Sequence, residues 1–382
     1  MTRKLASIQK INKLEPINGA DNIEKATVLG WELVVKKGEF KENDLCVYCE
    51  VDSVLPDRKE FEFLRERKFR IRTVKLKGQV SQGICFPLNV LPSYNRKMKM
   101  GYEENKDVTE LLGVTKYESK SEIQERVQET VKSNRIQKFL KRYKWYRNLF
   151  TTKSKSQFPA FIKKTDEDRI QLFPNIYNDY KDLQFQVTEK VDGQSATYFV
   201  VENFSKKLWE FWKEDYIFGV CSRNFLLPKE DNSTWWRIAK QFDIKKKMLE
   251  YITSVNNVMG LNEYRLQYFV IQGEILGEGI QGNKYKVTGL DFYVFNVFDS
   301  YDTYNNIEQV QLAGALGLKC VPTINTSFDL LPTITENVIY SKGKSVLANI
   351  QREGIVVRNY NQNISFKIIN PDFLLKYQDN EE

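Results

Sequence analysis

Histidine is absent from the 382 residues of this chain. Without an imidazole group, the chain cannot build a Ser-His-Asp or Cys-His catalytic unit, a histidine-ligated zinc site or a histidine general base. Any catalysis must therefore use lysine, arginine, aspartate, glutamate, tyrosine or cysteine side chains, or a metal ion held by oxygen ligands.

Cysteine is scarce, with five residues at positions 46, 49, 85, 221 and 320. An odd and scattered set is a poor disulfide framework and suits a reducing compartment. Cys46 and Cys49 have the spacing of a zinc knuckle, but they lie in an apolar, strand-like run with only Cys85 nearby and no second pair. The pattern favours buried thiols over a metal site.

Long hydrophobic runs are also missing. None approaches the ~20 residues that a membrane-spanning helix needs, and the start of the chain has no apolar signal core. Hydrophobic residues still make up 41% of the chain, which allows sizeable cores and argues against disorder. We therefore expect an intracellular, cytoplasmic protein of two or three domains that has no membrane partner.

The net charge of +8 is concentrated in one segment. Residues 119–156 contain 11 lysines and arginines but 3 acidic residues, and the remainder of the chain is balanced. The segment has no proline or glycine and shows rough helical spacing of apolar residues, which predicts a basic helical linker. Basic residues interleaved with aromatic ones suit RNA binding, and a solvated helix face is an equal alternative. The RNA-binding candidates are Lys138, Lys141, Arg142 and Lys144.

Residues 1–118 contain short apolar stretches separated by turn residues. Several short strands at close spacing predict a small β-barrel of the OB type, which would bind RNA. The strand candidates are residues 26–35, 44–51, 70–77 and 83–88.

Residues 157–382 form the third predicted unit. A capping-box variant at residues 165–168 predicts the start of a helix there. Strand-like runs then alternate with turns, and a helix is expected around residues 234–253. The predicted fold class is α+β with antiparallel sheets.

Two β-rich stretches flank the run Glu189-Lys-Val-Asp-Gly193. Lys-x-Asp-Gly at a strand–turn–strand junction is the nucleophile motif of covalent nucleotidyltransferases. Burial and nearby cations can lower the pKa of Lys190, so that its neutral amine attacks the α-phosphorus of a nucleotide. Asp192 could orient that amine or hold a metal-bound water, and Gly193 permits close approach of the backbone. Taken alone, the run fits an ordinary hairpin turn better.

Five further runs follow Lys190 in order. They are GVCSRN (219–224), QGEILG (272–277), DFYVFNVFD (291–299), EGIVVR (353–358) and SFKIIN (365–370). With the Lys-x-Asp-Gly run, they resemble motifs I, Ia, III, IIIa, IV and V of the ligase and capping-enzyme superfamily. Six ordered matches are far more specific than any one of them.

The wider sequence resembles the RNA ligase family with an N-terminal OB domain, known from Deinococcus and Naegleria. Residues 8–24, 34–39 and 158–171 look like the corresponding segments of that family. The resemblance covers nearly the whole chain and is weakest between about residues 93 and 156. It implies an OB-like RNA-binding domain over residues 1–118, a basic linker over 119–156 and a nucleotidyltransferase (adenylation) domain over 157–382.

The resemblance implies a role for each matched residue. Lys190 is the nucleophile that becomes adenylated. Asp192 and Glu353 are implied to hold the waters of a divalent metal ion, with Asp291 as a helper. The implied contacts with the nucleotide are those of Arg223 and Glu274 with the ribose, Phe295 with adenine, Lys367 with the α-phosphate, and Gly193 through its backbone. Each also has a plain structural alternative as a turn cap, an edge charge or a core aromatic residue.

Motif V departs from the superfamily pattern. Many members carry two lysines separated by one residue, whereas Ser365 takes the first place here and Lys367 the second. A second cation could come from elsewhere, such as Arg358, or be dispensable. This departure affects the phosphate contacts and leaves the nucleophile unchanged.

The expected function is therefore ATP-dependent RNA ligation with Mg²⁺ or Mn²⁺, through a lysyl-AMP intermediate, by a monomer acting in RNA repair on nicked duplexes or free ends. A DNA ligase or an mRNA capping enzyme is the first alternative. In those families an OB domain follows motif V, whereas here 15 residues follow Lys367 and the barrel-like unit lies upstream. A catalytically dead RNA-binding relative is the second alternative, and the presence of Lys190, Glu274, Glu353 and Lys367 argues against it.

Overall fold

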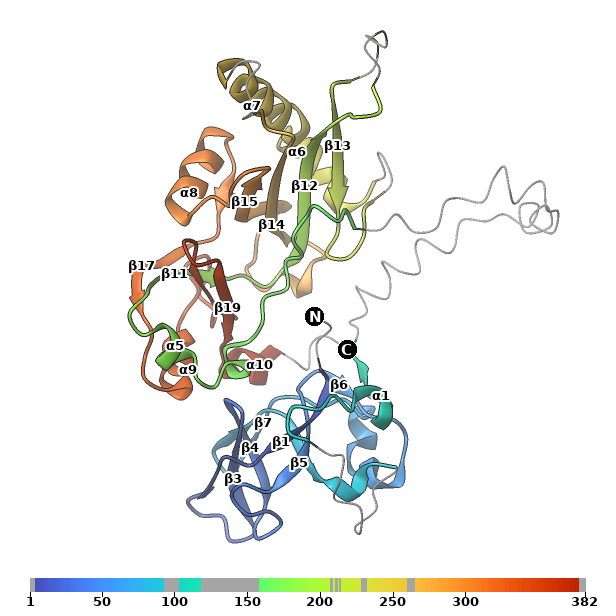
Figure 1. The fold of residues 1–382 in the computed structure, drawn as a ribbon, viewed down its shortest axis with the longest axis vertical. Coiled ribbons are helices and arrows are strands. Elements are labelled where there is room, and N and C mark those ends of the chain that lie inside the picture. Colours follow the sequence, from blue (N-terminus) through green and yellow to red (C-terminus); the bar gives the residue numbers. More distant parts are fainter. Residues whose placement is uncertain are drawn as a thin grey trace, which may run out of the picture.

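The structure is a computed structural model of the chain, shown as a ribbon in Figure 1. It describes residues 4–92, 103–117, 158–206, 209, 212, 214–227, 232–259 and 265–377. The basic segment 119–156 lies outside the described residues, and so do the RNA-binding candidates Lys138, Lys141, Arg142 and Lys144.

The N-terminal unit, blue to cyan in Figure 1, consists of short antiparallel strands around one core. Strands β1, β5 and β9 form one sheet, β2, β3 and β4 a second, and β6 with β10 and β7 with β8 form two pairs. Trp31 and Tyr48 are fully buried in the core that these sheets share. The strands are β1 Ala6–Lys10, β2 Lys13–Pro16, β3 Ile23–Val28, β4 Trp31–Lys36, β5 Leu45–Cys49, β6 Ser53–Val54, β7 Val74–Leu76, β8 Gln79–Ser81, β9 Ile84–Pro87 and β10 Thr115–Lys116, and the one α-helix among the described residues here is α1, Thr109–Leu112.

The single strand predicted over residues 26–35 is wrong, because the chain turns in its middle. β3 ends at Val28 and β4 begins at Trp31, and these two residues face each other in an antiparallel pair. Leu29 adopts a φ of 52° between them. A two-residue hairpin needs a positive φ in its turn, which Leu29 provides. Gly30 has no side chain, so the turn can lie close to its neighbours.

The thiols of the N-terminal unit lie inside its core. Cys46, Cys49 and Cys85 are buried and form no disulfide, and the Sγ atoms of Cys46 and Cys85 are 3.4 Å apart. Burial raises the pKa of the Cys85 thiol, so it stays protonated and apolar in character. The prediction of buried thiols is thus confirmed for these residues.

The C-terminal unit, green to red in Figure 1, is built on two sheets. The larger has the order β13-β12-β14-β15-β16, in which β16 alone runs parallel to its neighbour. The smaller has the order β17-β11-β18-β19 and is antiparallel throughout. The strands are β11 Gln184–Lys190, β12 Gln194–Glu202, β13 Tyr216–Cys221, β14 Tyr268–Gly277, β15 Leu290–Asp299, β16 Lys319–Cys320, β17 Thr323–Asp329, β18 Gly354–Asn359 and β19 Ile364–Ile369.

Helices pack against both sheets. The helices α6 and α7 correspond to the range predicted to be helical, and a break at Asp243, with a φ of 51°, separates them. Their apolar residues share one core with β12, β14 and β15, while α5 and α9 pack on the smaller sheet. The helices are α5 Ile176–Tyr180, α6 Thr234–Gln241, α7 Ile244–Met259, α8 Asn306–Ala315, α9 Ile334–Ser341 and α10 Pro371–Tyr377. No described helix combines the length and the apolarity that crossing a membrane requires.

The helix predicted to start at residues 165–168 does not form. The chain has no helical turn there, and the main chain of Asp168 accepts a hydrogen bond from the N–H of Lys367, 2.8 Å away on β19. The acidic side chains that suggested a helix cap bind arginines instead, Asp166 with Arg223 and Glu167 with Arg358. Tertiary ion pairs therefore override the local capping signal.

The two units touch along the turn after β3. The N–H of Gly30 donates to the carbonyl of Gln171 at 2.9 Å, and the Arg169 guanidinium lies 5.4 Å from the centre of the Trp31 ring and 3.6 Å from Asp52. A Cβ at position 30 would lie 2.8 Å from the Cα of Gln171, so glycine is needed for this close approach.

Candidate active site at the junction of two sheets

The candidate nucleophile lies where the chain leaves one sheet and enters the other. Lys190 is the last residue of β11 in the smaller sheet, and β12 of the larger sheet begins at Gln194. The register of β11 and β18 places Lys190 opposite Gly354, so the preceding residue, Glu353, reaches the lysine. Both carboxylate oxygens of Glu353 lie 2.6 Å from Lys190 Nζ.

Lys190 is kept in its charged form by this arrangement. Burial alone would lower the pKa of Lys190, but the contact with Glu353 and the nearby charges of Glu274 and Asp192 outweigh it and raise the pKa above its ordinary value. The amine is therefore protonated, and it must lose this proton before it can attack a phosphorus atom.

Glu274 lies on β14 beside the turn that follows Lys190. Its Oε1 accepts a hydrogen bond from the N–H of Gly193 at 3.2 Å. Burial, together with Glu353 and Asp192, raises the pKa of Glu274 to about 8, while Lys190 acts in the opposite direction. A Cβ at Gly193 would lie 2.4 Å from the carbonyl oxygen of Ile275, so this turn has no room for a larger residue.

Asp192 has a cationic partner that the sequence motifs did not indicate. Its Oδ2 accepts a hydrogen bond from Lys284 Nζ, and its main-chain N–H donates to the Tyr285 hydroxyl at 3.0 Å. Burial and the charge of Glu353 raise the pKa of Asp192, and Lys284 opposes them. Lys284 falls between two of the motifs, in the segment 278–290, so no motif spacing pointed to it.

Basic residues gather near Lys190 as well. Lys367 on β19 lies 3.8 Å from Asp166, which also forms an ion pair with Arg223. Burial and the positive charge of Lys190 lower the pKa of Lys367 to about 7, with Arg169 and Arg223 adding to the effect and Asp166 opposing it. A buried lysine held near cations is well placed to bind an anion, which would restore its charge.

Arg358 does not stand free to replace the missing motif V lysine. Its Nε donates to the Ser365 hydroxyl at 3.2 Å, its Nη1 to the carbonyl of Phe295 at 2.5 Å and its Nη2 to Glu167 at 3.1 Å. The guanidinium therefore ties β18 and β19 to β15 and to the segment before Arg169.

Phe295 and Asp291 both lie on β15 but in different surroundings. Phe295 is half-buried against a small apolar cluster that contains Val191 and Tyr293. Asp291 is bound by Lys319, whose Nζ lies 2.5 Å from Oδ2. Asp291 thus pairs with Lys319, whereas the charges of Asp192, Glu274 and Glu353 raise the pKa of Lys190.

The carboxylates fit a metal ion that is held mostly through water. Within the described ranges, no three acidic or cysteine side chains are close enough to bind a metal ion together. Mg²⁺ typically keeps several waters and uses one or two carboxylates plus substrate phosphates. Asp192 and Glu353 provide two such carboxylates, and each influences the pKa of groups around Lys190.

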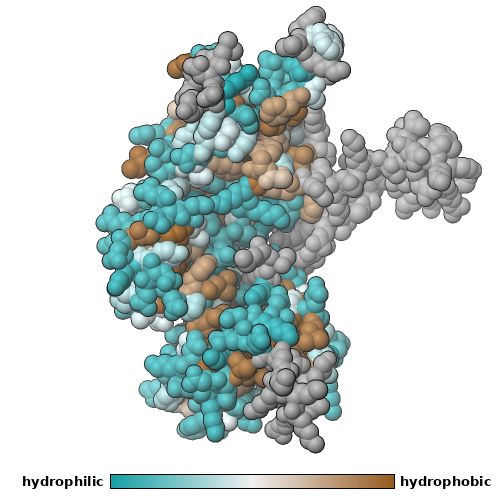
Figure 2. Space-filling view, in the orientation of Figure 1, coloured by the Kyte–Doolittle hydropathy of each residue, from teal (hydrophilic) through white to brown (hydrophobic). Residues whose placement is uncertain are grey.

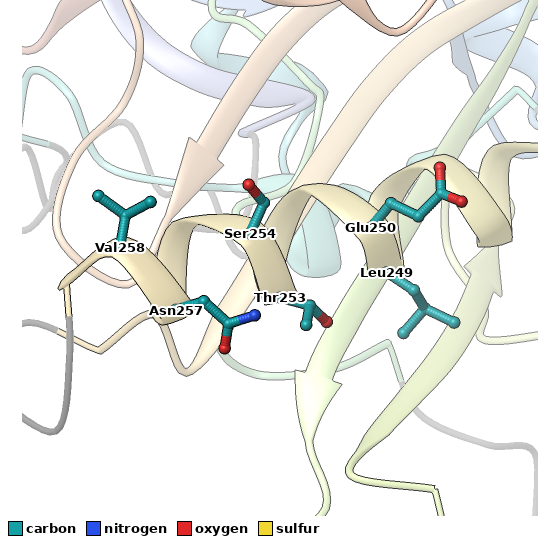
Figure 3. A pocket seen from close by; sticks show the side chains of 6 residues that line it. All are labelled: Leu249, Glu250, Thr253, Ser254, Asn257 and Val258. Atoms are coloured by element: carbon teal, nitrogen blue, oxygen red, sulfur yellow. The ribbon is translucent and has the colours of Figure 1, made fainter.

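Two surface hollows lie away from this site. One, of about 510 Å³, lies along α7 and is lined by Leu249, Glu250, Thr253, Ser254, Asn257 and Val258 (Figure 3). A second, of about 400 Å³, lies between α6 and α7 over Phe218 and Trp236. Hydrophilic residues cover most of the face shown in Figure 2, with small hydrophobic patches between them. None of the motif residues singled out for catalysis or nucleotide binding lines either hollow.

Comparison with known proteins identifies the family. Residues 183–377 match the RNA ligase family, and residues 5–88 match an OB-fold domain. This chain belongs to the RNA ligase family. The ligase has its OB fold first, as the short strands and the family resemblance predicted, and its RNA ligase domain second, as the motifs predicted. The predicted fold class and enzyme class are confirmed.

Solved structures of a Naegleria gruberi RNA ligase resemble this ligase along its whole length. A mutant with ATP and Mn is 30% identical, with 98% of this chain and 100% of that chain covered and a TM-score of 0.75. The Naegleria enzyme with PPi is 31% identical, with 99% and 100% covered and a TM-score of 0.74. A mutant with AMP and Mn is 30% identical at a TM-score of 0.74, with 99% and 100% covered. A comparison with curated proteins found no match.

The family decides the first of the alternatives drawn from the sequence. RNA ligase is confirmed over DNA ligase and capping enzyme. The roles of the individual residues stay predictions, which the geometry groups into a set of carboxylates, Asp192, Glu274 and Glu353, and a set of cations, Arg223 and Lys367.

Proposed function

We propose that this RNA ligase uses ATP to join a 3′-hydroxyl and a 5′-phosphate through a lysyl-AMP at Lys190. The observation that supports this most is the pairing of Lys190 with both oxygens of Glu353 at the junction of the two sheets. The Naegleria structures with ATP, AMP and PPi correspond to the substrate, the transferred group and the product of the first step.

The reaction has three steps. Lys190 first loses its proton to solvent, and its neutral amine then attacks the α-phosphorus of ATP. A phosphorus–nitrogen bond forms, pyrophosphate leaves, and the nitrogen releases a second proton. An oxygen of the RNA 5′-phosphate then attacks the same phosphorus and releases Lys190. Finally, the 3′-hydroxyl attacks the activated 5′-phosphorus, the phosphodiester forms and AMP leaves.

The protein side chains divide this work between them. Lys367 binds the α-phosphate and Arg223 binds the ribose. Glu274 accepts a hydrogen bond from a ribose hydroxyl, and Phe295 contacts adenine. Asp192 and Glu353 would hold a divalent ion through its waters, with Asp291 as a helper. When bound, Mg²⁺ or Mn²⁺ supplies positive charge to the transferring phosphorus and to these carboxylates.

The proposed RNA substrate, oligomeric state and location follow from the same assignment of function. We propose nicked duplexes or free RNA ends in RNA repair, bound by the OB fold and the basic segment, and a monomer as the active form. The cysteines of the described residues are all free, which supports an intracellular, cytoplasmic location.

The test is incubation with ATP labelled on its α-phosphate, in the presence of Mg²⁺ or Mn²⁺, followed by denaturing electrophoresis. We expect a labelled band that is lost in Lys190→Ala and kept in Lys245→Ala, which removes an exposed lysine on α7. An adduct that persists in Lys190→Ala, located by peptide mass spectrometry at another residue, would refute the assignment.

A further inference from the structure

Lys284 forms a buried ion pair with the aspartate of the Lys-x-Asp-Gly motif. The side chains of Lys284 and Asp192 are 8% and 14% exposed. A lysine is seldom buried to this extent without a partner, because desolvation of its charge is costly. Asp192 is the partner here, and its Oδ2 accepts the hydrogen bond from Lys284 Nζ.

The loop that delivers Lys284 has an unusual backbone. Gln281, Asn283 and Lys286 have φ values of 43°, 47° and 56°, in the left-handed region that side chains other than glycine rarely adopt. The Asn283 side chain closes the loop by two hydrogen bonds to the main chain of Val287, at 2.9 and 3.0 Å. Such conformations persist when the surroundings fix them, and they cluster at functional sites.

The C-terminal helix contacts Lys284 through two aromatic rings. Nζ lies 5.3 Å from the ring centre of Phe373 and 5.5 Å from that of Tyr377, both on α10. Cation–π contact with two rings favours one position of the ammonium group. Within the same loop, the Tyr285 hydroxyl accepts the main-chain N–H of Asp192, so two consecutive loop residues bind the aspartate.

We propose that Lys284 is a positioning residue that fixes the Asp192 carboxylate for the catalytic divalent ion. Lys284 binds Oδ2, and this leaves Oδ1 to accept from a metal-bound water. The two supporting rings keep Lys284 in place when the ion is present, so the lysine orients Asp192 and does not compete for it. This inference rests on the proposed function, because it takes Asp192 as a carboxylate of the metal site.

The experiment measures Mn²⁺ binding to the full-length protein in the presence of a non-hydrolysable ATP analogue, by the electron paramagnetic resonance signal of free Mn²⁺. Removal of a group that orients a metal-binding side chain typically weakens metal binding by about 10–100-fold. We expect Lys284→Met to show a loss of that order. Lys284→Arg, which keeps the charge, should recover most of the affinity.

A matched control is available at the same helix. Lys342 forms an ion pair with Asp372 of α10 at 3.0 Å and does not pair with a motif carboxylate, so Lys342→Met should leave Mn²⁺ binding unchanged. Circular dichroism checks the fold. If Lys284→Met does not fold, Lys284→Gln, which keeps a hydrogen-bond donor without the charge, tests the same expectation.

Self-adenylation of the same variants separates the two proposals. We expect the Mn²⁺ concentration for half-maximal labelling to rise in Lys284→Met, with the rate recovering at saturating Mn²⁺. If the unmodified protein forms no lysyl-AMP, the proposed function is wrong. If it does, and Lys284→Met binds Mn²⁺ as well as or more tightly than the unmodified protein, the positioning role of Lys284 is wrong.

Discussion

At the scale of single residues, Lys190 lies near both carboxylates and cationic side chains. Carboxyl groups raise the pKa of Lys190, while Lys367 loses its charge more easily because it is buried among cations. In the free site, the pKa of Lys190 is therefore above the ordinary lysine value and that of Lys367 is below it. We expect nucleotide binding to change the protonation of both lysines, so the pH dependence of binding reports on them.

Lys367 should make nucleotide binding depend on pH near neutrality. Its pKa of about 7 lies below the ordinary lysine value, so the charge is present below pH 7 and lost above it. Phosphate prefers the charged form, and we expect affinity for ATP to fall as the pH rises from about 6 to 8. Lys367→Arg keeps its charge throughout this range and should flatten the fall.

The measurement is titration calorimetry of ATP binding at several pH values, with both proteins in the same buffers. Protonation of ATP itself affects both proteins equally, so the difference between the two curves reports on residue 367. Parallel curves for the two proteins would show that Lys367 does not contact the phosphates.

The site residues that the sequence could predict are those whose spacing is set by the strands. Lys190 and Glu353 were placed by their motifs, and the register of β11 and β18 brings them together. Lys284 and Asp166 could not be placed in this way. Both lie outside the strands, and only the folded loops decide that Lys284 meets Asp192 and that Asp166 meets Arg223.

At the scale of elements, strand prediction succeeded where an apolar run ended at a turn with glycine. The strands β11 and β12, before and after the turn at Gly193, are examples. It failed where local signals competed with tertiary contacts. Residues 165–168 carry a good helix-capping pattern, yet Asp166 and Glu167 form ion pairs with arginines and the main chain runs beside β19. Leu29 and Gly30 split a predicted strand because the turn packs against the second unit.

The basic segment 119–156 is the element expected to dominate the salt dependence of RNA binding. Each bound phosphate contributes a slope of about −0.7 to −0.9 to the log–log plot of affinity against salt. Replacing Lys138, Lys141, Arg142 and Lys144 with glutamine should flatten that slope by about one unit for each phosphate that is no longer bound. Fluorescence anisotropy with labelled RNA measures it, and an unchanged slope would favour a solvated helix face.

At the scale of the whole molecule, the two units have separate cores but share a close contact. One cluster of buried residues lies within residues 5–114, and the others begin at residue 162. Between them, Thr335 donates to Glu32 at 3.1 Å, and Gly30 meets Gln171. Each unit can therefore keep its fold while the contact between them is altered.

Gly30→Ala should loosen the contact without unfolding either unit. The added Cβ would lie 2.3 Å from the end of the Ile334 side chain and 2.8 Å from the main chain of Gln171. Overpacking of this kind typically costs about 1–3 kcal/mol. We expect a larger radius of gyration by small-angle X-ray scattering and slower RNA sealing.

Gly314→Ala, on α8, provides the comparison, because its Cβ would meet nothing within 4 Å. It should change neither the radius of gyration nor the sealing rate. Equal scattering curves for the two alanine variants would mean that the turn at Gly30 does not hold the units together.

The segment from Asp168 to Gln171 connects the N-terminal unit to β19, and this connection matters when force acts on the molecule. Gln171 and Arg169 are attached to the N-terminal unit, and Asp168 is hydrogen-bonded to Lys367 on β19. We therefore expect a pull on the OB fold to reach the strand of Lys367 through the main chain between Asp168 and Gln171. When a bound RNA is under tension, we expect the lysine proposed to bind phosphate to be displaced before either core unfolds, so that sealing stops while both units are still folded.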